Sequence, residues 1–256
     1  MSRVVLPDGV ALEVSRIPGA GPETLVFLHE GLGSVSAWRD FPARVAEATG
    51  LPALVYSRRG YGRSAPLSGP RHARFMHDEA FEVLPALLRA ENVAAPFLVG
   101  HSDGATIALL YAARHPGASG VVAMAPHLFV EPLTLQSIRA AKTAFEDGDL
   151  RARLERHHGD NVDDAFWGWN RVWLSDEFRS FHIEAELAAV TAPVLAIQGR
   201  DDPYGTLAQL DGLQRSVSGP LTVDILDACG HSPHRERAEA TLAAIDDFVS
   251  RFRSRG

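Results

Sequence analysis

An apolar run and a helical pattern meet in Phe97-Leu98-Val99-Gly100-His101-Ser102-Asp103-Gly104. After this stretch, apolar side chains recur at the i, i+3, i+4 spacing of one helix face. The two glycines permit a sharp strand-to-helix turn, which raises the hydroxyl of Ser102 above the edge of a sheet. The stretch therefore predicts a nucleophilic serine on a strand–turn–helix unit. The alternative is that Ser102 only caps the helix.

Seven further runs have the composition of strands, and helix-length segments separate most of them. The runs before and after the Pro7-Asp8-Gly9 turn predict a hairpin, and the later, continuously apolar runs are typical of strands covered on both faces. This alternation predicts an α/β fold with a mainly parallel, doubly wound, eight-stranded sheet. The seven runs are Val4–Leu6, Val10–Arg16, Thr24–His29, Ala53–Tyr56, Val121–Met124, Val194–Ile197 and Leu221–Leu226. The helical segments are Trp38–Ala48, His77–Arg89, Asp103–Arg114, Thr206–Ser216 and Glu236–Phe252.

One interval, residues 127–191, interrupts the alternation because it has no strand-like run. Its content is helical, and an interval of this length is too long for a structureless loop. We expect a helical lid inserted after the sixth strand, with residues 1–126 and 192–256 forming the core domain. Trp167, Trp169 and Trp173 either line a substrate site in this lid or only pack it onto the core.

The composition excludes several classes of protein. The chain has 256 residues, of which 46% are hydrophobic and 22% charged, as in ordinary globular proteins rather than disordered ones. Its 25 basic and 32 acidic side chains give a net charge of −7, which argues against a nucleic-acid partner. Cys229 is the single cysteine, so no internal disulfide can form. The sequence shows no membrane-length apolar run and no signal peptide, so we expect a cytoplasmic protein without a membrane partner.

A nucleophilic serine needs a base and an orienting acid, and two later loops supply candidates. Both loops follow a predicted strand, so both lie at the sheet edge that carries Ser102. The loop after Leu221–Leu226 offers His231, with His234 as its rival. The loop after Val194–Ile197 offers Asp202, and Asp201 is the alternative acid.

These motifs resemble the α/β-hydrolase superfamily, in particular its lid-bearing small esterases, haloperoxidase-like proteins and meta-cleavage-product hydrolases. The resemblance extends over essentially the whole chain. It implies Ser102, Asp202 and His231 as the catalytic residues, in the chain order of this fold. It also implies an oxyanion hole formed by the backbone N–H groups of Gly31 and Asp103.

Three positions depart from the family pattern. Ser57 replaces the aspartate of the family's Asp-x-x-Gly-x-Gly-x-Ser loop, which leaves the local structure of residues 57–64 open. Glu30 replaces a glycine, and Asp103 follows the nucleophile directly. Carboxylates in the pocket would repel an anionic substrate and could pair with an amine, although Asp103 could equally cap its helix. The Arg58-Arg59 pair either neutralises Glu30 or lies on the surface.

The first hypothesis for the function is a cofactor-independent serine hydrolase that cleaves a small carboxylic ester or an activated acyl compound. The second keeps the same residues but cleaves a carbon–carbon bond of a ring-fission product. The third is a ligand receptor on a hydrolase fold without turnover. No spacing of His, Cys or acidic residues fits a zinc or calcium site, so we expect no metal. The oligomeric state, monomer or homodimer, stays open.

Overall fold

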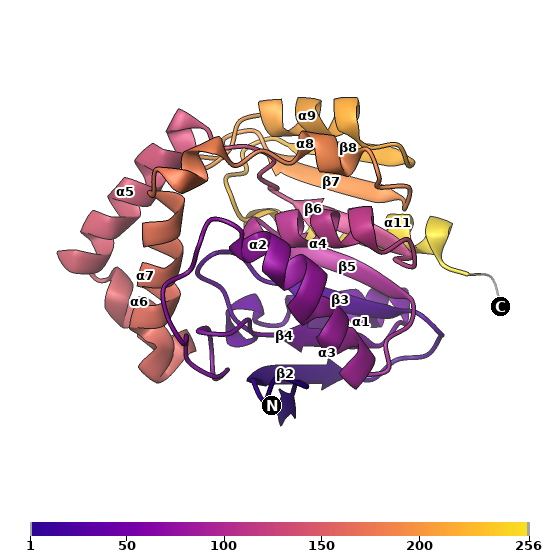
Figure 1. The fold of residues 1–256 in the computed structure, drawn as a ribbon. Helices are drawn as coiled ribbons and strands as arrows, with labels where there is room; N and C mark the ends of the chain where they lie inside the picture. Colours follow the sequence, from indigo (N-terminus) through magenta and orange to yellow (C-terminus); the bar gives the residue numbers. More distant parts are fainter. Residues whose placement is uncertain (1, 255–256) are drawn as a thin grey trace.

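A single sheet forms the centre of the protein in the computed structural model, which describes residues 2–254. Within this range the sheet has eight strands in the order β1-β2-β4-β3-β5-β6-β7-β8 (Figure 1). The strands are β1 (Ser2–Val5), β2 (Ala11–Ile17), β3 (Thr24–Leu28), β4 (Ala53–Tyr56), β5 (Pro96–His101), β6 (Gly120–Met124), β7 (Val194–Gly199) and β8 (Leu221–Leu226).

The direction of the strands changes only near one edge. β1 pairs with β2 and β2 with β4 in antiparallel register, whereas all other neighbouring strands, from β4 and β3 through β8, pair in parallel. The predicted mainly parallel, doubly wound, eight-stranded sheet is therefore confirmed. Because the carboxyl ends of parallel strands all lie on the same side of a sheet, the loops after β3, β5, β7 and β8 lie together.

Helices cover both faces of the sheet. One face packs against α1 (Phe41–Thr49) and α11 (Ala238–Phe252), which contact each other. The other face packs against α4 (Asp103–Arg114) at its centre. The remaining helices around α4 are α2 (Phe75–Asp78), α3 (Leu84–Ala90), α8 (Glu184–Leu187) and α9 (Ala208–Ser216).

The central strands are apolar on both faces because both faces are buried. In β3, the side chains of Leu25 and Phe27 join the core beneath α1 and α11. Val26 and Leu28 point to the opposite core, beneath α4. Successive strand residues face opposite ways, so two cores on one strand require a continuous apolar run rather than alternation. This explains the pattern from which these strands were predicted.

Helices occupy the interval between β6 and β7. They are α5 (Pro132–Glu146), α6 (Leu150–His158), α7 (Val162–Trp173) and α8, with short 3-10 turns at Gly159–Asn161 and Glu177–Ser180. We call residues 127–191 the helical insertion. Figure 1 shows α5, α6 and α7 gathered beside one edge of the sheet. They therefore stand next to the loops that follow the parallel strands.

Three predicted helices are divided more finely in the structure. The segment Trp38–Ala48 splits into a 3-10 turn, Ser36–Trp38, and α1, because Pro42 lacks an N–H and suits only the first turn of a helix. The segment His77–Arg89 contains a π-helical turn, Glu79–Val83, before α3, whose first turn holds Pro85. Within the predicted segment Glu236–Phe252, Arg237, with φ −133°, separates a short helix, α10 (Pro233–Glu236), from α11.

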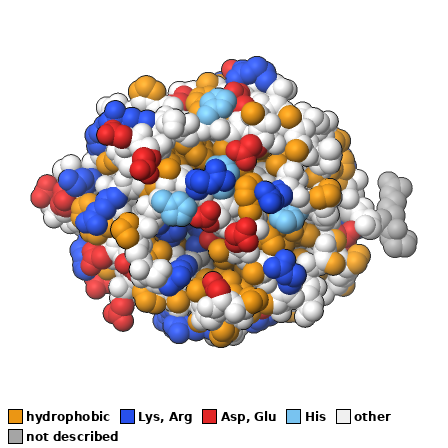
Figure 2. All heavy atoms as spheres, in the orientation of Figure 1, with side chains coloured by type: hydrophobic (Ala, Val, Ile, Leu, Met, Phe, Trp, Pro, Cys, Tyr) orange, Lys and Arg blue, Asp and Glu red, His pale blue; other side chains and the backbone are white. Residues whose placement is uncertain are grey.

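Basic and acidic side chains are interspersed on the molecular face drawn in Figure 2. Apolar atoms lie between them on the same face, without a single block of one charge sign. Among residues 2–254, no helix combines the length and the apolar character that a membrane crossing requires.

Candidate active site

Ser102 occupies the turn between β5 and α4 in a conformation that few side chains adopt. Its φ is 54° and its ψ is −120°. The turn brings the following backbone very close to β3, since a Cβ added to Gly104 would lie 2.0 Å from the carbonyl oxygen of Leu28. The backbone N–H of Ser102 donates to the carbonyl oxygen of Met124 at 2.9 Å. These contacts hold Ser102 at the end of the central strand, as the strand–turn–helix motif predicts.

Asp202 and His231 come together from the loops after β7 and β8. The Nδ1 of His231 lies 2.8 Å from Oδ2 and 3.0 Å from Oδ1 of Asp202. With Nδ1–H donating to the carboxylate, the neutral imidazole has its acceptor at Nε2. Burial acts to raise the pKa of Asp202, but the hydrogen bonds from His231 and from the backbone of Tyr204 bring this pKa below its usual value. Asp202 is therefore ionised at neutral pH.

The two rival residues lie elsewhere. Asp201 is exposed, whereas Asp202 beside it is buried. His234 is also buried, but its ring packs against Trp38 at 4.8 Å and Phe41 at 5.6 Å between centroids. The acid and the imidazole that contact each other are thus Asp202 and His231.

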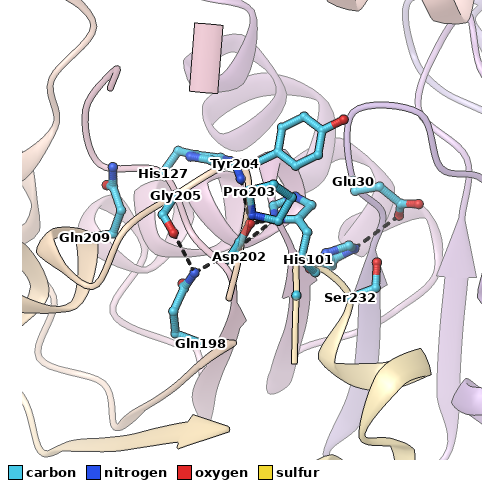
Figure 3. A network of polar contacts seen from close by, with 12 residues as sticks. Glu30, His101, His127, Gln198, Asp202, Pro203, Tyr204, Gly205, Gln209 and Ser232 are labelled. Carbon is cyan, nitrogen blue, oxygen red and sulfur yellow. Dashed lines mark hydrogen bonds and ion pairs between the residues drawn. The ribbon is translucent and has the colours of Figure 1, made fainter. Parts of the chain in front are cut away.

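Two residues that the sequence analysis did not identify support Asp202. Gln198, at the end of β7, donates from Nε2 to Asp202 Oδ2 at 2.7 Å and to the carbonyl oxygen of Gly205 at 3.2 Å (Figure 3). Tyr204 donates its backbone N–H to Asp202 Oδ1 at 2.8 Å, and its ring lies 4.7 Å from that of His231. No local motif marks these residues, because their role depends on how the loop after β7 folds back.

A further carboxylate organises the loop that carries His231. Glu236, in α10, accepts the backbone N–H of Gly230 at 2.7 Å and that of Ser232 at 2.9 Å. These two donors flank His231 in the chain. The carboxylate therefore restrains the backbone on both sides of the imidazole.

Ser102 and His231 line the same cavity, which has a volume of about 210 Å³. This volume is small for a ligand pocket. Among the described residues that line the cavity, none is Lys or Arg, and two are acidic. The lining consists of Glu30, Gly31, Leu32, His101, Ser102, Asp103, His127, Thr134, Ile138, Trp169, Trp173, Tyr204, His231 and Ser232.

The tryptophans of α7 differ in their positions. Trp169 and Trp173 line the cavity, and a Cβ added to Gly31 would lie 2.2 Å from the indole Nε1 of Trp169. Gly31 therefore lies directly against the helical insertion. Trp167 does not line this cavity; it borders a separate hollow of about 430 Å³ between α7 and residues 67–73. Its ring packs against Phe145 and Phe166.

Asp103 is fully buried and bound from two sides. Its Oδ1 accepts the indole N–H of Trp173 at 3.1 Å, and its Oδ2 lies 3.8 Å from Nη1 of the buried Arg58. Burial raises the pKa of Asp103, and the charge of Arg58 only partly opposes this shift. Its Oδ2 has no hydrogen-bond partner and its Oδ1 binds Trp173, so the side chain does not cap its helix. Asp103 instead joins the turn at Ser102 to the helical insertion.

Arg58 also holds the loop after β3. It donates from Nη2 to the carbonyl oxygen of Glu30 at 2.9 Å, and its backbone N–H donates to His29 Nε2 at 3.0 Å. Since Nε2 of His29 accepts, its Nδ1 carries the proton and donates to the carbonyl oxygen of Glu30 at 2.7 Å. Arg58 therefore neutralises Asp103 rather than the carboxylate of Glu30, and it does not lie on the surface.

In the loop of residues 57–64, Ser57 stands at the position of the family's aspartate, and Glu13 provides a carboxylate to this loop. Ser57 accepts the backbone N–H of Val35 at 2.9 Å and donates its hydroxyl to Glu13 Oε2 at 2.8 Å. The same carboxylate oxygen accepts the backbone N–H of Arg63 at 3.0 Å. Glu13, from β2, thus supplies the negative charge that Ser57 lacks.

His127 adds a second imidazole to the cavity wall. It lies at the start of the helical insertion, and its ring is 5.8 Å from that of His231 and 5.1 Å from that of Trp173. Burial is the main cause that lowers its pKa to about 3. His127 is therefore uncharged at neutral pH.

Comparison with known proteins connects this geometry to a family. Residues 25–244 match the sequence model described as the alpha/beta hydrolase family. The chain is 24% identical, over 90% of its length and 88% of the relative's, to a 2-hydroxy-6-oxononadienedioate/2-hydroxy-6-oxononatrienedioate hydrolase of Cupriavidus pinatubonensis. It is 23% identical, over 92% of its length and 85% of the relative's, to an esterase of Mycobacterium tuberculosis.

The solved structures agree on the fold. The enol-lactonase from Burkholderia xenovorans superposes with a TM-score of 0.74 at 18% identity, covering 97% of this chain and all of that one. The family match spans most of the chain and includes the strand–turn–helix unit at Ser102. This chain is therefore a hydrolase and a member of the alpha/beta hydrolase family.

Proposed function

We propose that this chain is a serine hydrolase that cleaves a small, uncharged carboxylic ester or activated acyl compound through an acyl-enzyme on Ser102. The observation that carries this proposal is the shared cavity of Ser102 and His231, with His231 bound to the ionised Asp202. The same three residue types form the triad of serine hydrolases on several unrelated folds.

In the first half of the reaction, the Ser102 oxygen attacks the substrate carbonyl while His231 Nε2 takes the hydroxyl proton. Asp202 holds the imidazole in the tautomer that leaves Nε2 free and stabilises the imidazolium that forms. The tetrahedral intermediate then expels the alcohol, which receives its proton from His231. In the second half, His231 takes a proton from water, and the resulting attack on the acyl group releases the acid and restores Ser102.

The negative oxygen of each intermediate is held by the backbone N–H groups of Gly31 and Asp103. Both residues line the cavity beside Ser102. The carboxylate of Asp103 would oppose this charge if it were alone, and Arg58 at 3.8 Å offsets it. Backbone donors are suited to this task because they are already oriented before the charge develops.

The size and charge of the cavity support a small, uncharged substrate. A volume of about 210 Å³ leaves little room beyond a short acyl group and its alcohol. Glu30 and Asp103 already lie against Arg235 and Arg58, and the described lining offers no Lys or Arg that could bind an acidic group of a substrate. We also propose that the helical insertion acts as a lid, since Trp169 and Trp173 line the cavity from α7.

The second candidate is hydrolysis of a carbon–carbon bond, as the name of the Cupriavidus pinatubonensis relative describes. That relative is named for dienedioate and trienedioate substrates, which carry two carboxylates. A cavity with two acidic side chains and no Lys or Arg in its described lining disfavours such a dianion. The ester reaction is therefore the better supported of the two.

The test compares two esters that differ in charge. We expect p-nitrophenyl acetate to be hydrolysed with a kcat/KM at least about tenfold above that of p-nitrophenyl hydrogen succinate, a difference of about 1.4 kcal/mol. Ser102→Ala should abolish turnover of both. Full activity of Ser102→Ala would refute the acyl-enzyme. Turnover of a ring-fission dienedioate without turnover of either ester would favour carbon–carbon cleavage.

A further inference from the structure

His101 lies immediately before Ser102, and its ring contacts the loop that carries His231. It is buried, with 1% of its surface exposed. Its Nε2 lies 2.7 Å from the carbonyl oxygen of His231, which can only accept, so Nε2–H donates. Its Nδ1 lies 3.4 Å from Glu30 Oε2, in the loop after β3 (Figure 3). One side chain thus joins the three loops that meet at the cavity.

Both nitrogens of His101 face oxygen atoms, Nε2 the carbonyl of His231 and Nδ1 the carboxylate of Glu30. A neutral imidazole has one N–H and one lone pair, whereas the imidazolium has two N–H donors. With Nε2–H directed at the carbonyl of His231, a neutral ring would point its Nδ1 lone pair at the carboxylate of Glu30. Protonation of Nδ1 replaces this repulsion with an ion pair. The titratable groups around the ring include His231 and His234, at 5.0 Å and 4.8 Å between centroids.

Other side chains hold Glu30 against His101, so its carboxylate is not free to bind a substrate. Its side chain is 19% exposed and lies between His101 and Arg235, whose Nη2 is 3.7 Å from Oε1. Arg235 is itself anchored by donating to the carbonyl oxygen of Ala37 at 2.8 Å. Burial acts to raise the pKa of Glu30, but His101, Arg235 and His234 together bring this pKa well below its usual range. The carboxylate is therefore ionised at neutral pH.

We propose that Glu30 and His101 are positioning residues, which form an ion pair that holds the backbone of His231 and so keeps its imidazole aligned between Asp202 and Ser102. This role rests on the proposed serine-hydrolase function. Glu236 restrains the N–H groups on either side of His231, and His101 restrains its carbonyl. Misplacing a reacting group by about 1 Å can cost about 100-fold in rate, so such restraint bears directly on turnover.

The first test is Glu30→Gln, which keeps the shape of the side chain and removes its charge. With p-nitrophenyl acetate, we expect kcat per active site, counted by fluorophosphonate labelling, to fall about tenfold. KM should stay within about twofold, since alignment of His231 stabilises the transition state rather than the bound substrate. Glu184→Gln is the matched control. Glu184 is 20% exposed and also lies between an arginine and a histidine, Arg215 and His182, but it does not line the cavity.

The other function for Glu30, binding of a cationic substrate, gives a different result. In that case Glu30→Gln would leave kcat for the uncharged ester unchanged and would raise KM only for an ester with an amino group. This outcome would overturn the positioning role. An equal loss of kcat in Glu184→Gln would also overturn it, since the loss would then follow from removing any partly buried, paired carboxylate.

A double-mutant cycle tests whether the two residues act as a unit. His101→Gln retains an amide donor for the carbonyl of His231, whereas His101→Leu retains none, so we expect kcat to follow the order wild type, Gln, Leu. The kcat of the double variant should be less than about twofold below that of His101→Gln alone. Multiplication of the two separate losses would refute the pairing.

The charge of His101 can be measured without any substrate. Nitrogen-15 NMR of the wild-type imidazole at pH 7 should show both ring nitrogens protonated, and Glu30→Gln should remove one proton. A neutral ring in the wild type would refute the ion pair whether or not the protein hydrolyses esters. Absence of ester turnover with a doubly protonated ring would instead refute the proposed function and leave the pair intact.

Discussion

Ser102 holds a backbone conformation that costs roughly 1–3 kcal/mol for a residue other than glycine. The surrounding structure must offset this cost, and the close contact of Gly104 with β3 and the burial of α4 do so. The carboxylate of Asp103 is similarly unfavourable by itself and is stabilised by Arg58 and Trp173. The strained backbone of Ser102 and the buried carboxylate of Asp103 are thus adjacent, at the position of the proposed nucleophile.

Asp202→Asn tests the role of the acid that binds His231. The amide keeps the shape of the side chain but can present an N–H to His231, which favours the tautomer with its proton on Nε2. That tautomer cannot accept the proton of Ser102, so kcat for p-nitrophenyl acetate should fall roughly 10⁴-fold. Asp201→Asn is the control, since this neighbouring acid is exposed, and its kcat should stay within about twofold. A loss below tenfold in Asp202→Asn would contradict the assigned role.

The ends of the parallel strands and two inserted helices, α5 and α7, build the cavity. β5, β7 and β8 end at the same edge of the sheet, so the residues that follow them converge although they are far apart in the chain. α7 adds the wall that faces them. Trp169 and Trp173 are four residues apart and share one helix face, whereas Trp167 is turned away from Trp169 by roughly 200°.

This arrangement predicts that α7 limits the length of the acyl group. Trp169→Leu should enlarge the cavity and raise the ratio of kcat/KM for p-nitrophenyl hexanoate over acetate by about tenfold, since each methylene in a pocket contributes about 1–3 kcal/mol. Trp167→Leu, on the same helix but outside the cavity, should leave the ratio unchanged. Equal ratios in the two variants would show that α7 does not limit the acyl group.

The sequence predicts most of this architecture because its signals are local. Continuous apolar runs identify the strands, and the glycines around Ser102 identify the turn. The division of the segment His77–Arg89 was not predicted, because a π-helical turn depends on packing rather than on periodicity. The different position of Trp167 could have been predicted from helical spacing.

Other features of the cavity could not be predicted, because they arise from contacts between distant segments. Gln198 becomes relevant only when the loop after β7 folds back on Asp202. Glu13 compensates for Ser57 across 44 positions of sequence, and Trp173 reaches Asp103 across 70. Neither pair has a spacing that a motif could capture.

At the scale of the whole molecule, buried histidines make stability depend on pH. Burial is the main cause that lowers the pKa values of His29, His127, His158 and His234. In the unfolded chain these groups bind protons below a pKa of about 6.5, whereas in the folded protein they remain neutral to lower pH. The unfolded state therefore binds more protons, and stability falls as the pH falls below about 6.5.

We expect the free energy of unfolding, measured by urea denaturation, to decrease steadily between pH 6.5 and pH 5. Each such histidine contributes a slope of up to about 1.4 kcal/mol per pH unit, and His127, with a pKa of about 3, contributes over the whole interval. His127→Gln should therefore reduce the slope. Constant stability between pH 6.5 and 5 would refute this account of the buried histidines.

The proposed reaction requires the hydroxyl of Ser102 to be an activated nucleophile. A fluorophosphonate reacts covalently only with such a serine, so peptide mass spectrometry of the treated protein tests the claim directly. We predict one adduct per chain on Ser102, and none in folded Ser102→Ala. An unmodified Ser102 in folded wild-type protein, or the same adduct on another residue of Ser102→Ala, would contradict it.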